Sequence, residues 1–304
     1  MINKKINKTI TWVDVESPTI EEIRHLMEEY DISPNIAKEL QLPTYKEKII
    51  FSKKYFYTVL HFPAFRHSHL NDNVQEIDFI VGNNFIITTR YESIDALERF
   101  TKEFEVNTIL DRGIMEDNAG YIFYYIVKEL YKSMSDELDS INDKMKFIEK
   151  TIFKGKEKEM LLNISKVNHD LINLNHIINS HKDIIESLEN NGTEIFNEDF
   201  SNNFSKILNE YYRIKNNLSS NIDFIREIRD TNDSILSSKQ NEIMKTLTVI
   251  TFLALPFTVI TGFFQMNTRY TPLIGSINDW QIIVFGEIIV MLVLAMFAKY
   301  KKWF

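Results

Sequence analysis

Two apolar stretches near the C-terminus constrain this chain more than any other feature. Residues 247–264 contain no charged side chain, and residues 282–298 contain one, Glu287. Each stretch approaches the roughly 20 residues that an α-helix needs to cross about 30 Å of hydrocarbon. We therefore expect two transmembrane helices, at residues 247–264 and 281–299, joined by an extracytoplasmic loop at residues 265–280.

Positive side chains indicate how this hairpin lies in the membrane. Lys245 precedes the first stretch, and Lys299, Lys301 and Lys302 follow the second, in a basic tail at residues 300–304. Cytoplasmic flanks of membrane helices carry an excess of lysine and arginine, so both termini are expected in the cytoplasm. No long apolar run follows the first lysines of the chain, which argues against a cleaved signal peptide. We expect a multi-pass protein of the plasma (inner) membrane.

Composition narrows the chemistry of the remaining chain. The formal net charge is −8 and there is no cysteine, which excludes disulfides and thiolate metal sites. An acidic balance disfavours nucleic acid as a partner and suits either solubility or the attraction of cations. The sequence contains no glycine-rich loop that could hold a phosphate, and we do not expect an enzyme.

The first 115 residues alternate like strands and then turn helical, which predicts an α+β cytoplasmic domain, a mixed sheet with helices packed on it. The strand-like runs are residues 10–15, 48–51, 55–62, 76–81 and 85–89. Residues 17–22 carry a helix-start signal, and the period becomes helical from Ile94.

Long helices are expected to connect this domain to the membrane. Residues 116–198 predict a helical hairpin with a turn near Gly155, and residues 199–246 a stalk helix that continues into the first membrane span, because no proline or glycine interrupts it before Leu255. An apolar seam in steps of three and four runs along the stalk, from Phe204 to Ile235, and is expected to face other helices. Two asparagines on the seam, Asn221 and Asn232, either fix register or oligomeric state or lie on a partly wet face.

A stripe of small, hydroxyl and flexible side chains continues along the same helix into the membrane. Its members are Asn241, Met244, Leu247 or Thr248, Thr251, Leu255, Thr258 and Gly262. Small-residue stripes mark helix packing, whereas a ring of such stripes would line a pore with hydroxyl groups and apolar constrictions. The residues alone leave both interpretations open.

The first span ends at Gln265, Met266 and Asn267, which we expect at the outer mouth. Asparagine at a helix end commonly caps the helix. Its carbonyl also suits a hydrated divalent cation, because Mg²⁺ gives up its water shell reluctantly.

Taken together, these segments resemble the CorA magnesium and cobalt transporter family. The motifs that carry the resemblance in the membrane region are Asn241-Glu242-Ile243-Met244-Lys245-Thr246-Leu247-Thr248, Leu255-Pro256-Phe257-Thr258, Thr261-Gly262-Phe263-Phe264, Met266-Asn267 and Lys301-Lys302-Trp303-Phe304. In the soluble region they are Trp12-Val13-Asp14, Val59-Leu60-His61-Phe62-Pro63 and Gly82-Asn83-Asn84-Phe85-Ile86-Ile87-Thr88. The resemblance covers nearly the whole chain.

The resemblance implies a funnel-shaped homopentamer that conducts Mg²⁺, with Co²⁺ or Ni²⁺ as further cargo. Asn267 would form the selectivity ring and hold Mg²⁺ through its hydration shell, with Thr258 as a hydroxyl ring below. Met244, Leu247 and Leu255 would form the constriction, and Asn241 would stand at the cytoplasmic exit. In this picture the stalk seam and the membrane stripe both face inward.

Three departures from the family pattern bear on ion choice and regulation. Gln265 replaces the glycine of the family's Gly-Met-Asn signature, and the outer loop carries Arg269 and only Asp279 where the family is acidic. Lys206 falls at the position of a stalk aspartate that helps to bind regulatory Mg²⁺. Other acids would then have to serve, such as Asp199, Glu210 or Asp223. The alternatives to Mg²⁺ transport are transport of another divalent ion such as Zn²⁺, with or without proton coupling, and a non-conducting membrane scaffold or sensor.

We expect structural roles, and no metal or catalytic role, for the remaining histidine and acidic side chains. His61, His67 and His69 are close in sequence, and the last two are expected as surface residues of a loop. Glu76 and Asp78 alternate along a strand and are expected to point to one solvated face. Glu287 is expected to reach the lipid headgroups or the water at the outer mouth.

Overall fold

A computed structural model describes residues 2–7, 9–44, 46–63, 74–109, 118–192, 195–196, 198–266, 275 and 277–301. The chain divides into two compact units, residues 1–228 and residues 229–304. Asn267, His67 and His69 fall outside the described residues, as do Arg269 and the side chain of Asp199. The expectations for these residues therefore stay predictions.

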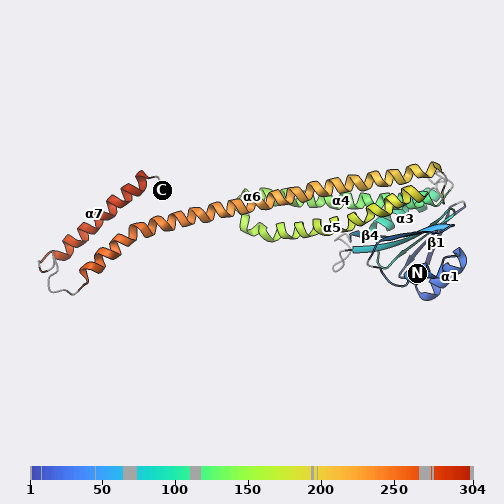
Figure 1. The fold of residues 1–304 in the computed structure, drawn as a ribbon, viewed down its shortest axis with the longest axis horizontal. Coiled ribbons are helices and arrows are strands. Elements are labelled where there is room, and N and C mark those ends of the chain that lie inside the picture. The colour runs from blue at the N-terminus through green and yellow to red at the C-terminus, as the bar shows by residue number, and fades with distance from the viewer. Residues whose placement is uncertain are drawn as a thin grey trace. The chain divides into compact units, whose positions relative to one another are not determined.

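The first unit is built on a mixed six-stranded sheet with the order β1-β2-β6-β5-β4-β3 (Figure 1). Its strands are β1 (Ile2–Asn7), β2 (Ile10–Glu16), β3 (Lys48–Phe51), β4 (Tyr55–Pro63), β5 (Val74–Gly82) and β6 (Phe85–Arg90). Strands β2 and β6 pair in parallel and all other neighbours are antiparallel. The predicted strands are present, and β1 is an additional edge strand that its lysine-rich sequence did not reveal.

Helices cover both faces of the sheet. On one face lie α1 (Ile20–Tyr30) and α2 (Pro34–Glu39), whose apolar residues share a core with alternate residues of β2 and β4, with Ile80 of β5 and with Ile87 of β6. Thr19 and Glu22 form a capping box at the start of α1, as the helix-start signal predicts. On the other face lie α3 (Asp95–Ile109), α4 (Gly120–Ile152) and α5 (Glu157–Asn191). Phe123 of α4 makes edge-to-face contacts with Phe56 and Phe79 of the sheet, at ring-centroid distances of 5.2 and 5.1 Å.

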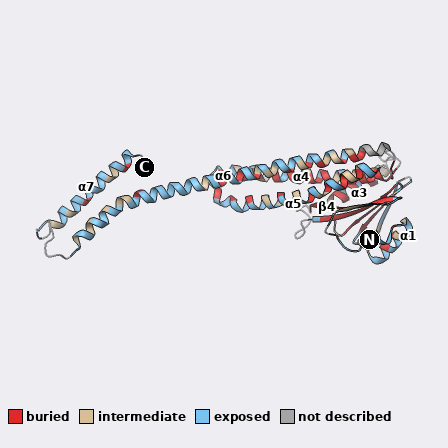
Figure 2. Ribbon diagram, viewed as in Figure 1, coloured by how far each residue is buried: buried red, intermediate tan, exposed pale blue. Residues whose placement is uncertain are grey.

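The longest element is α6, a single helix of 67 residues from Glu198 to Phe264. Within the first unit, its seam from Phe204 to Ile228 is buried against α4 and α5 of the same chain (Figure 2). Asn221 Nδ2 donates to Leu138 O of α4 at 3.5 Å, and Lys215 Nζ donates to Asn175 Oδ1 of α5 at 2.7 Å.

This arrangement corrects the expectation that the stalk seam faces inward, toward copies of the chain. An intramolecular three-helix bundle satisfies the heptad pattern, because α4 and α5 supply the apolar partners. Asn232 is fully buried, so the expectation of a partly wet face is wrong for this residue. Its amide nitrogen and oxygen have no hydrogen-bond partner among the described residues.

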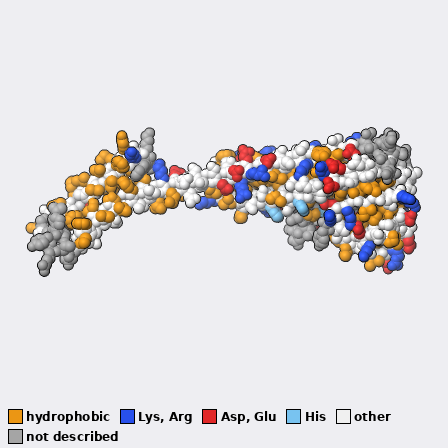
Figure 3. Space-filling model, in the orientation of Figure 1, with side chains coloured by type: hydrophobic (Ala, Val, Ile, Leu, Met, Phe, Trp, Pro, Cys, Tyr) orange, Lys and Arg blue, Asp and Glu red, His pale blue; other side chains and the backbone are white. Residues whose placement is uncertain are grey.

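The second unit contains the C-terminal part of α6 and α7 (Asp279–Tyr300). Both helices are long and apolar enough to cross a membrane, with mean hydropathies of 2.1 and 2.4 over their most apolar windows. Only 6% and 11% of these windows are buried, unlike the core helix of a soluble protein. Figure 3 shows hydrophobic side chains gathered over the surface of this unit.

Candidate functional site

The membrane part of α6 has two different faces. From Val249 to Phe264, the buried or half-buried positions recur at helical spacing: Val249, Phe252, Leu253, Pro256, Ile260, Thr261 and Phe264. Val249 is only 2% exposed. A hydrogen bond of 2.9 Å between Thr261 Oγ1 and Glu287 Oε1 joins this face to α7. We therefore call these seven residues the α7-facing side of α6.

The predicted pore stripe lies on the uncovered side of the same helix. Thr251, Leu255, Thr258 and Gly262 are all exposed, with Leu255 at 58%. Nine residues separate Val249 from Thr258, and at about 100° per residue they point in opposite directions. The members that precede Thr248, namely Asn241, Met244 and Leu247, are exposed too, but α6 is exposed all round at residues 237–248.

Threonine hydroxyls on the uncovered side present oxygen lone pairs outward. Thr251 Oγ1 donates to Leu247 O at 2.9 Å, and Thr258 Oγ1 donates to Leu255 O at 2.8 Å. A hydroxyl has one hydrogen and two acceptor lone pairs. Each of these threonines donates its hydrogen to a backbone oxygen of its own helix, which leaves the lone pairs as acceptors. The free acceptors suit the water shell of a cation, whose water hydrogens point outward. Thr248 makes the same kind of bond to Met244 O at 2.8 Å.

The described residues reach the start of the predicted filter but not its asparagine. Gln265 N donates to Thr261 O at 3.1 Å, and Met266 N donates to Phe263 O at 3.3 Å. The last turn of α6 therefore tightens as it ends, and both Gln265 and Met266 are exposed. The roles of Gln265, Met266 and Asn267 as a filter stay predictions.

The proposed regulatory acids have local partners in the structure. Glu210 pairs with Arg213 at 2.7 Å, and Asp223 pairs with Arg226 at 2.8 Å. Lys206 Nζ donates to Asn203 Oδ1 at 3.0 Å and lies 6.0 Å from the ring centroid of Tyr124. Among the described residues, no three histidine, aspartate or glutamate side chains are placed to hold a metal ion.

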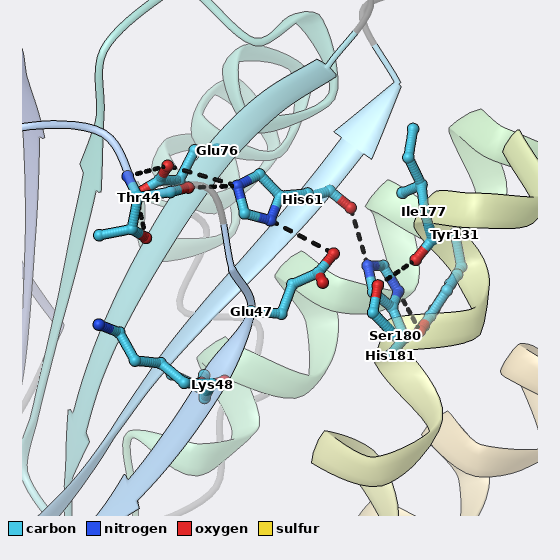
Figure 4. A network of polar contacts seen from close by, with 10 residues as sticks. Thr44, Glu47, Lys48, His61, Glu76, Tyr131, Ile177, Ser180 and His181 are labelled. Atoms are coloured by element: carbon cyan, nitrogen blue, oxygen red, sulfur yellow. Dashed lines mark hydrogen bonds and ion pairs between the residues drawn. The ribbon is translucent and has the colours of Figure 1, made fainter. Parts of the chain in front are cut away.

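A polar network that the sequence analysis missed joins the sheet to the helices (Figure 4). His61 of β4 lies between two carboxylates, with Nδ1 3.3 Å from Glu47 Oε1 and Nε2 3.4 Å from Glu76 Oε2. Its Nε2 is also 2.8 Å from Thr44 O. Burial opposes charge on the imidazole, but the hydrogen bonds to Glu47 and Glu76 outweigh it and raise the pKa of His61 to about 10.

The same network continues into the helical layer through a second histidine. His181 Nε2 donates to the backbone oxygen of His61 at 2.8 Å, and the Tyr131 hydroxyl donates to His181 Nδ1 at 2.9 Å. This tautomer is neutral, and complete burial lowers the pKa of His181 to about 4. The chain of contacts connects α4, α5 and β4. A cavity of about 640 Å³ opens beside Glu47, His61 and Glu76, but His61 already supplies their positive partner.

Two carboxylates of β5 correct another expectation. Glu76 and Asp78 do share one face of the strand, but they are 8% and 1% exposed, because α2 and the segment after it cover that face. Glu76 accepts hydrogen bonds from the backbone nitrogen and the hydroxyl of Thr44, at 2.6 and 3.1 Å. Burial raises the pKa of Asp78 well above its usual range, and Thr89 Oγ1 donates to it at 2.9 Å. The expectation of a solvated face was wrong, because alternation along a strand shows which residues share a face and does not show what covers that face.

Comparisons with known proteins cover nearly the whole length of the chain. The CorA cobalt/magnesium transport protein of Thermotoga maritima is 20% identical over 299 residues, covering 98% of this chain and 84% of the relative. The corresponding protein of Methanocaldococcus jannaschii is 22% identical, covering 95% and 90%. The solved structure of the Methanocaldococcus jannaschii CorA magnesium transporter matches with a TM-score of 0.83 at 20% identity, over 97% of this chain and 92% of that one.

A second solved structure, that of the full-length CmaX protein, matches with a TM-score of 0.75 at 14% identity, covering 95% of this chain and 88% of that one. The likeness to both solved structures shows that the fold is shared. The family model described as "CorA-like Mg2+ transporter protein" matches residues 7–301. The chain therefore belongs to the CorA-like Mg²⁺ transporter family.

Proposed function

We propose that this protein transports divalent metal cations across a membrane, through a pore lined by the uncovered side of α6. The observation that carries the proposal is the division of this helix into two sides. One side packs on α7, and the opposite side bears Thr251, Leu255, Thr258 and Gly262, which are exposed among the residues that the structure describes. Hydroxyl acceptors and apolar constrictions in alternation suit a hydrated cation.

Several copies of the chain are needed to make such a pore. One stripe per chain cannot enclose a channel, so the stripes must face one another around an axis. We propose the homopentamer that the family resemblance implies, with α7 on the outside toward lipid. Native mass spectrometry in detergent tests this number, and a protein found only as monomers or dimers would contradict it.

Mg²⁺ is the proposed cargo, with Co²⁺ as a further one. Asn267 would hold Mg²⁺ by hydrogen bonds to its water shell, which spares the cost of stripping that shell. The membrane potential supplies the driving force, about 4.6 kcal/mol per 100 mV for a divalent ion, twice the single-charge value. Zn²⁺ is the alternative cargo, because Gln265 replaces the family's glycine next to the filter.

Uptake by the purified protein in liposomes tests the function, with Mg²⁺, Co²⁺ or Zn²⁺ supplied alone. Asn267→Ala should reduce flux at least tenfold, because it removes a ring of carbonyl acceptors and little packing area. Asn278→Ala is the matched control, since Asn278 lies in the same loop and its side chain makes no capping hydrogen bond to α7. Equal flux in both variants would move the filter elsewhere, and no flux of any of the three ions would overturn the function.

A further inference from the structure

Glu287 lies where an acidic side chain is least expected. It is the one charged residue in the apolar part of α7, and it is only 6% exposed. The sequence suggested that its carboxyl group reaches the lipid headgroups or the water at the outer mouth, and this expectation is wrong. The carboxyl group points to α6, where Oε1 lies 2.9 Å from Thr261 Oγ1.

The hydrogen atoms available to this pair decide its chemistry. Thr261 Oγ1 lies 2.8 Å from the Phe257 backbone oxygen and 2.9 Å from Glu287 Oε1. A carbonyl oxygen and an ionised carboxylate are acceptors only, and a threonine hydroxyl has a single hydrogen. One hydrogen shared between two acceptors makes two weak bonds, whereas a hydrogen on Glu287 gives each contact a hydrogen of its own. We propose that Glu287 is a carboxylic acid that donates to Thr261, while Thr261 donates to Phe257, and that this relay positions α7 on the back of the pore helix.

The surroundings of Glu287 fit a neutral acid. The α7-facing side of α6 carries no charged residue, and neither apolar stretch contains another titratable side chain. The nearest charges in sequence lie at the helix ends, at Lys245, Asp279 and Lys299. No described side chain in this unit can therefore act as a counter-ion, and an unpaired carboxylate in hydrocarbon is strongly disfavoured.

The relay acts on the outer end of the proposed pore, so its functional part rests on the proposed function. Thr261 precedes Gly262 of the stripe, and its backbone oxygen accepts from Gln265 N at 3.1 Å, next to the predicted filter. An ionised Glu287 would accept the single hydrogen of Thr261, and Thr261 would then no longer donate to the Phe257 backbone oxygen. It would also leave a charge between the helices. We therefore expect ion flux to depend on a hydrogen-bond donor at position 287.

Infrared spectroscopy of the full-length protein in lipid tests the protonation directly and needs no transport. At neutral pH, Glu287→Gln should remove one carboxylic acid C=O band. Thr261→Val should move that band to higher wavenumber, because the acid loses its acceptor, whereas Thr246→Val should not. Thr246 is the matched control, with a hydroxyl that donates to Glu242 O of its own helix at 3.0 Å. Absence of the band, or a band that Thr261→Val leaves in place, overturns the relay.

Flux measurements at equal pH on both sides of the liposome test the functional part. Glu287→Gln keeps a donor for Thr261, so its flux should match the wild type at neutral pH. Glu287→Leu lacks the donor, and its flux should be several-fold lower at every pH. If Glu287→Leu transports ions as fast as Glu287→Gln, the coupling is wrong. If the infrared bands behave as expected but no variant transports ions, the relay stands and the proposed function fails.

Discussion

The two units differ in how far they bury phenylalanine side chains. Phe123 of α4 is 1% exposed and packs on two phenylalanines of the sheet, whereas Phe263 of α6 is 67% exposed. The first unit completes its apolar core within one chain. The second unit leaves most of its apolar surface open, which lipid would cover together with the further copies of the pentamer that we propose. A single chain therefore buries the apolar core of the first unit and leaves the apolar surface of the second unit uncovered.

The two units also differ in the partners that they provide for buried ionisable side chains. In the first unit, the charge on His61 is balanced by Glu47 and Glu76 around it. In the second unit, Glu287 has one hydroxyl partner and no charged one among the described residues. A unit that surrounds its charges can keep them ionised. A hairpin in hydrocarbon must instead keep its acid neutral, as we propose for Glu287.

The largest expected effect comes from removing the two phenylalanines in turn. Phe123→Ala should lower the free energy of unfolding of the first unit by about 3–5 kcal/mol, since it leaves a cavity in a packed core. Phe263→Ala should leave that value unchanged within about 0.5 kcal/mol, because it changes no contact of the first unit.

The absence of cysteine makes this comparison measurable in the full-length protein. A single cysteine in place of Ala96, which is fully buried in α3, reports opening of the first unit by its reaction with a thiol reagent during urea titration. Equal losses in both phenylalanine variants would show that the two units do not keep separate cores.

The next effect depends on pH and concerns only the first unit. His61 has a folded-state pKa of about 10, above the roughly 6.5 of an unfolded histidine, so the folded state binds more protons between these values. Its stabilising contribution is present below pH 6.5 and is lost as the pH rises toward 10. We expect a loss of roughly 1–3 kcal/mol from pH 7 to pH 10, less than the full shift implies because water reaches the neighbouring carboxylates.

The same cysteine reporter measures this loss, with the thiol reaction rate corrected for pH on the unfolded chain. His61→Gln should be less stable at pH 7 and should lose less stability toward pH 10. His176→Gln is the matched control, because His176 is an exposed histidine of α5 beside the same cavity. An unchanged slope in His61→Gln would remove this histidine as the source of the pH dependence.

The sequence predicted those features that depend on local pattern. Alternation located β3 to β6 within two residues at each end, and the unbroken run without proline or glycine predicted α6 through to the membrane. Helical spacing also placed Thr251, Leu255 and Thr258 on one side of α6, where all three are exposed, whereas their role in a pore stays a proposal. Pattern failed for β1, whose lysines are typical of an edge strand but gave no apolar alternation.

Features that depend on contacts between distant segments could not be predicted in this way. His61 and His181 are 120 residues apart, and no spacing rule joins them. The heptad seam was read correctly as a packing surface, but its partners are α4 and α5 of the same chain. Periodicity shows that a surface is covered and does not say which helix covers it. The pairing of Glu287 with Thr261 was missed for the same reason.

The smallest expected effect concerns Leu247 of α6 and tests whether its exposed side chain faces a pore or faces lipid. Leu247 is 54% exposed on the side that we propose lines the pore, and apolar rings can close a pore by excluding water. Leu247→Asn should raise basal ion leak in liposomes several-fold, because a polar ring keeps water in the constriction. Leu247→Ile keeps the apolar ring and is the matched control, with leak unchanged. If Leu247→Asn leaks no more than Leu247→Ile, this exposed residue faces lipid, and the constriction must lie further along the stripe, at Leu255.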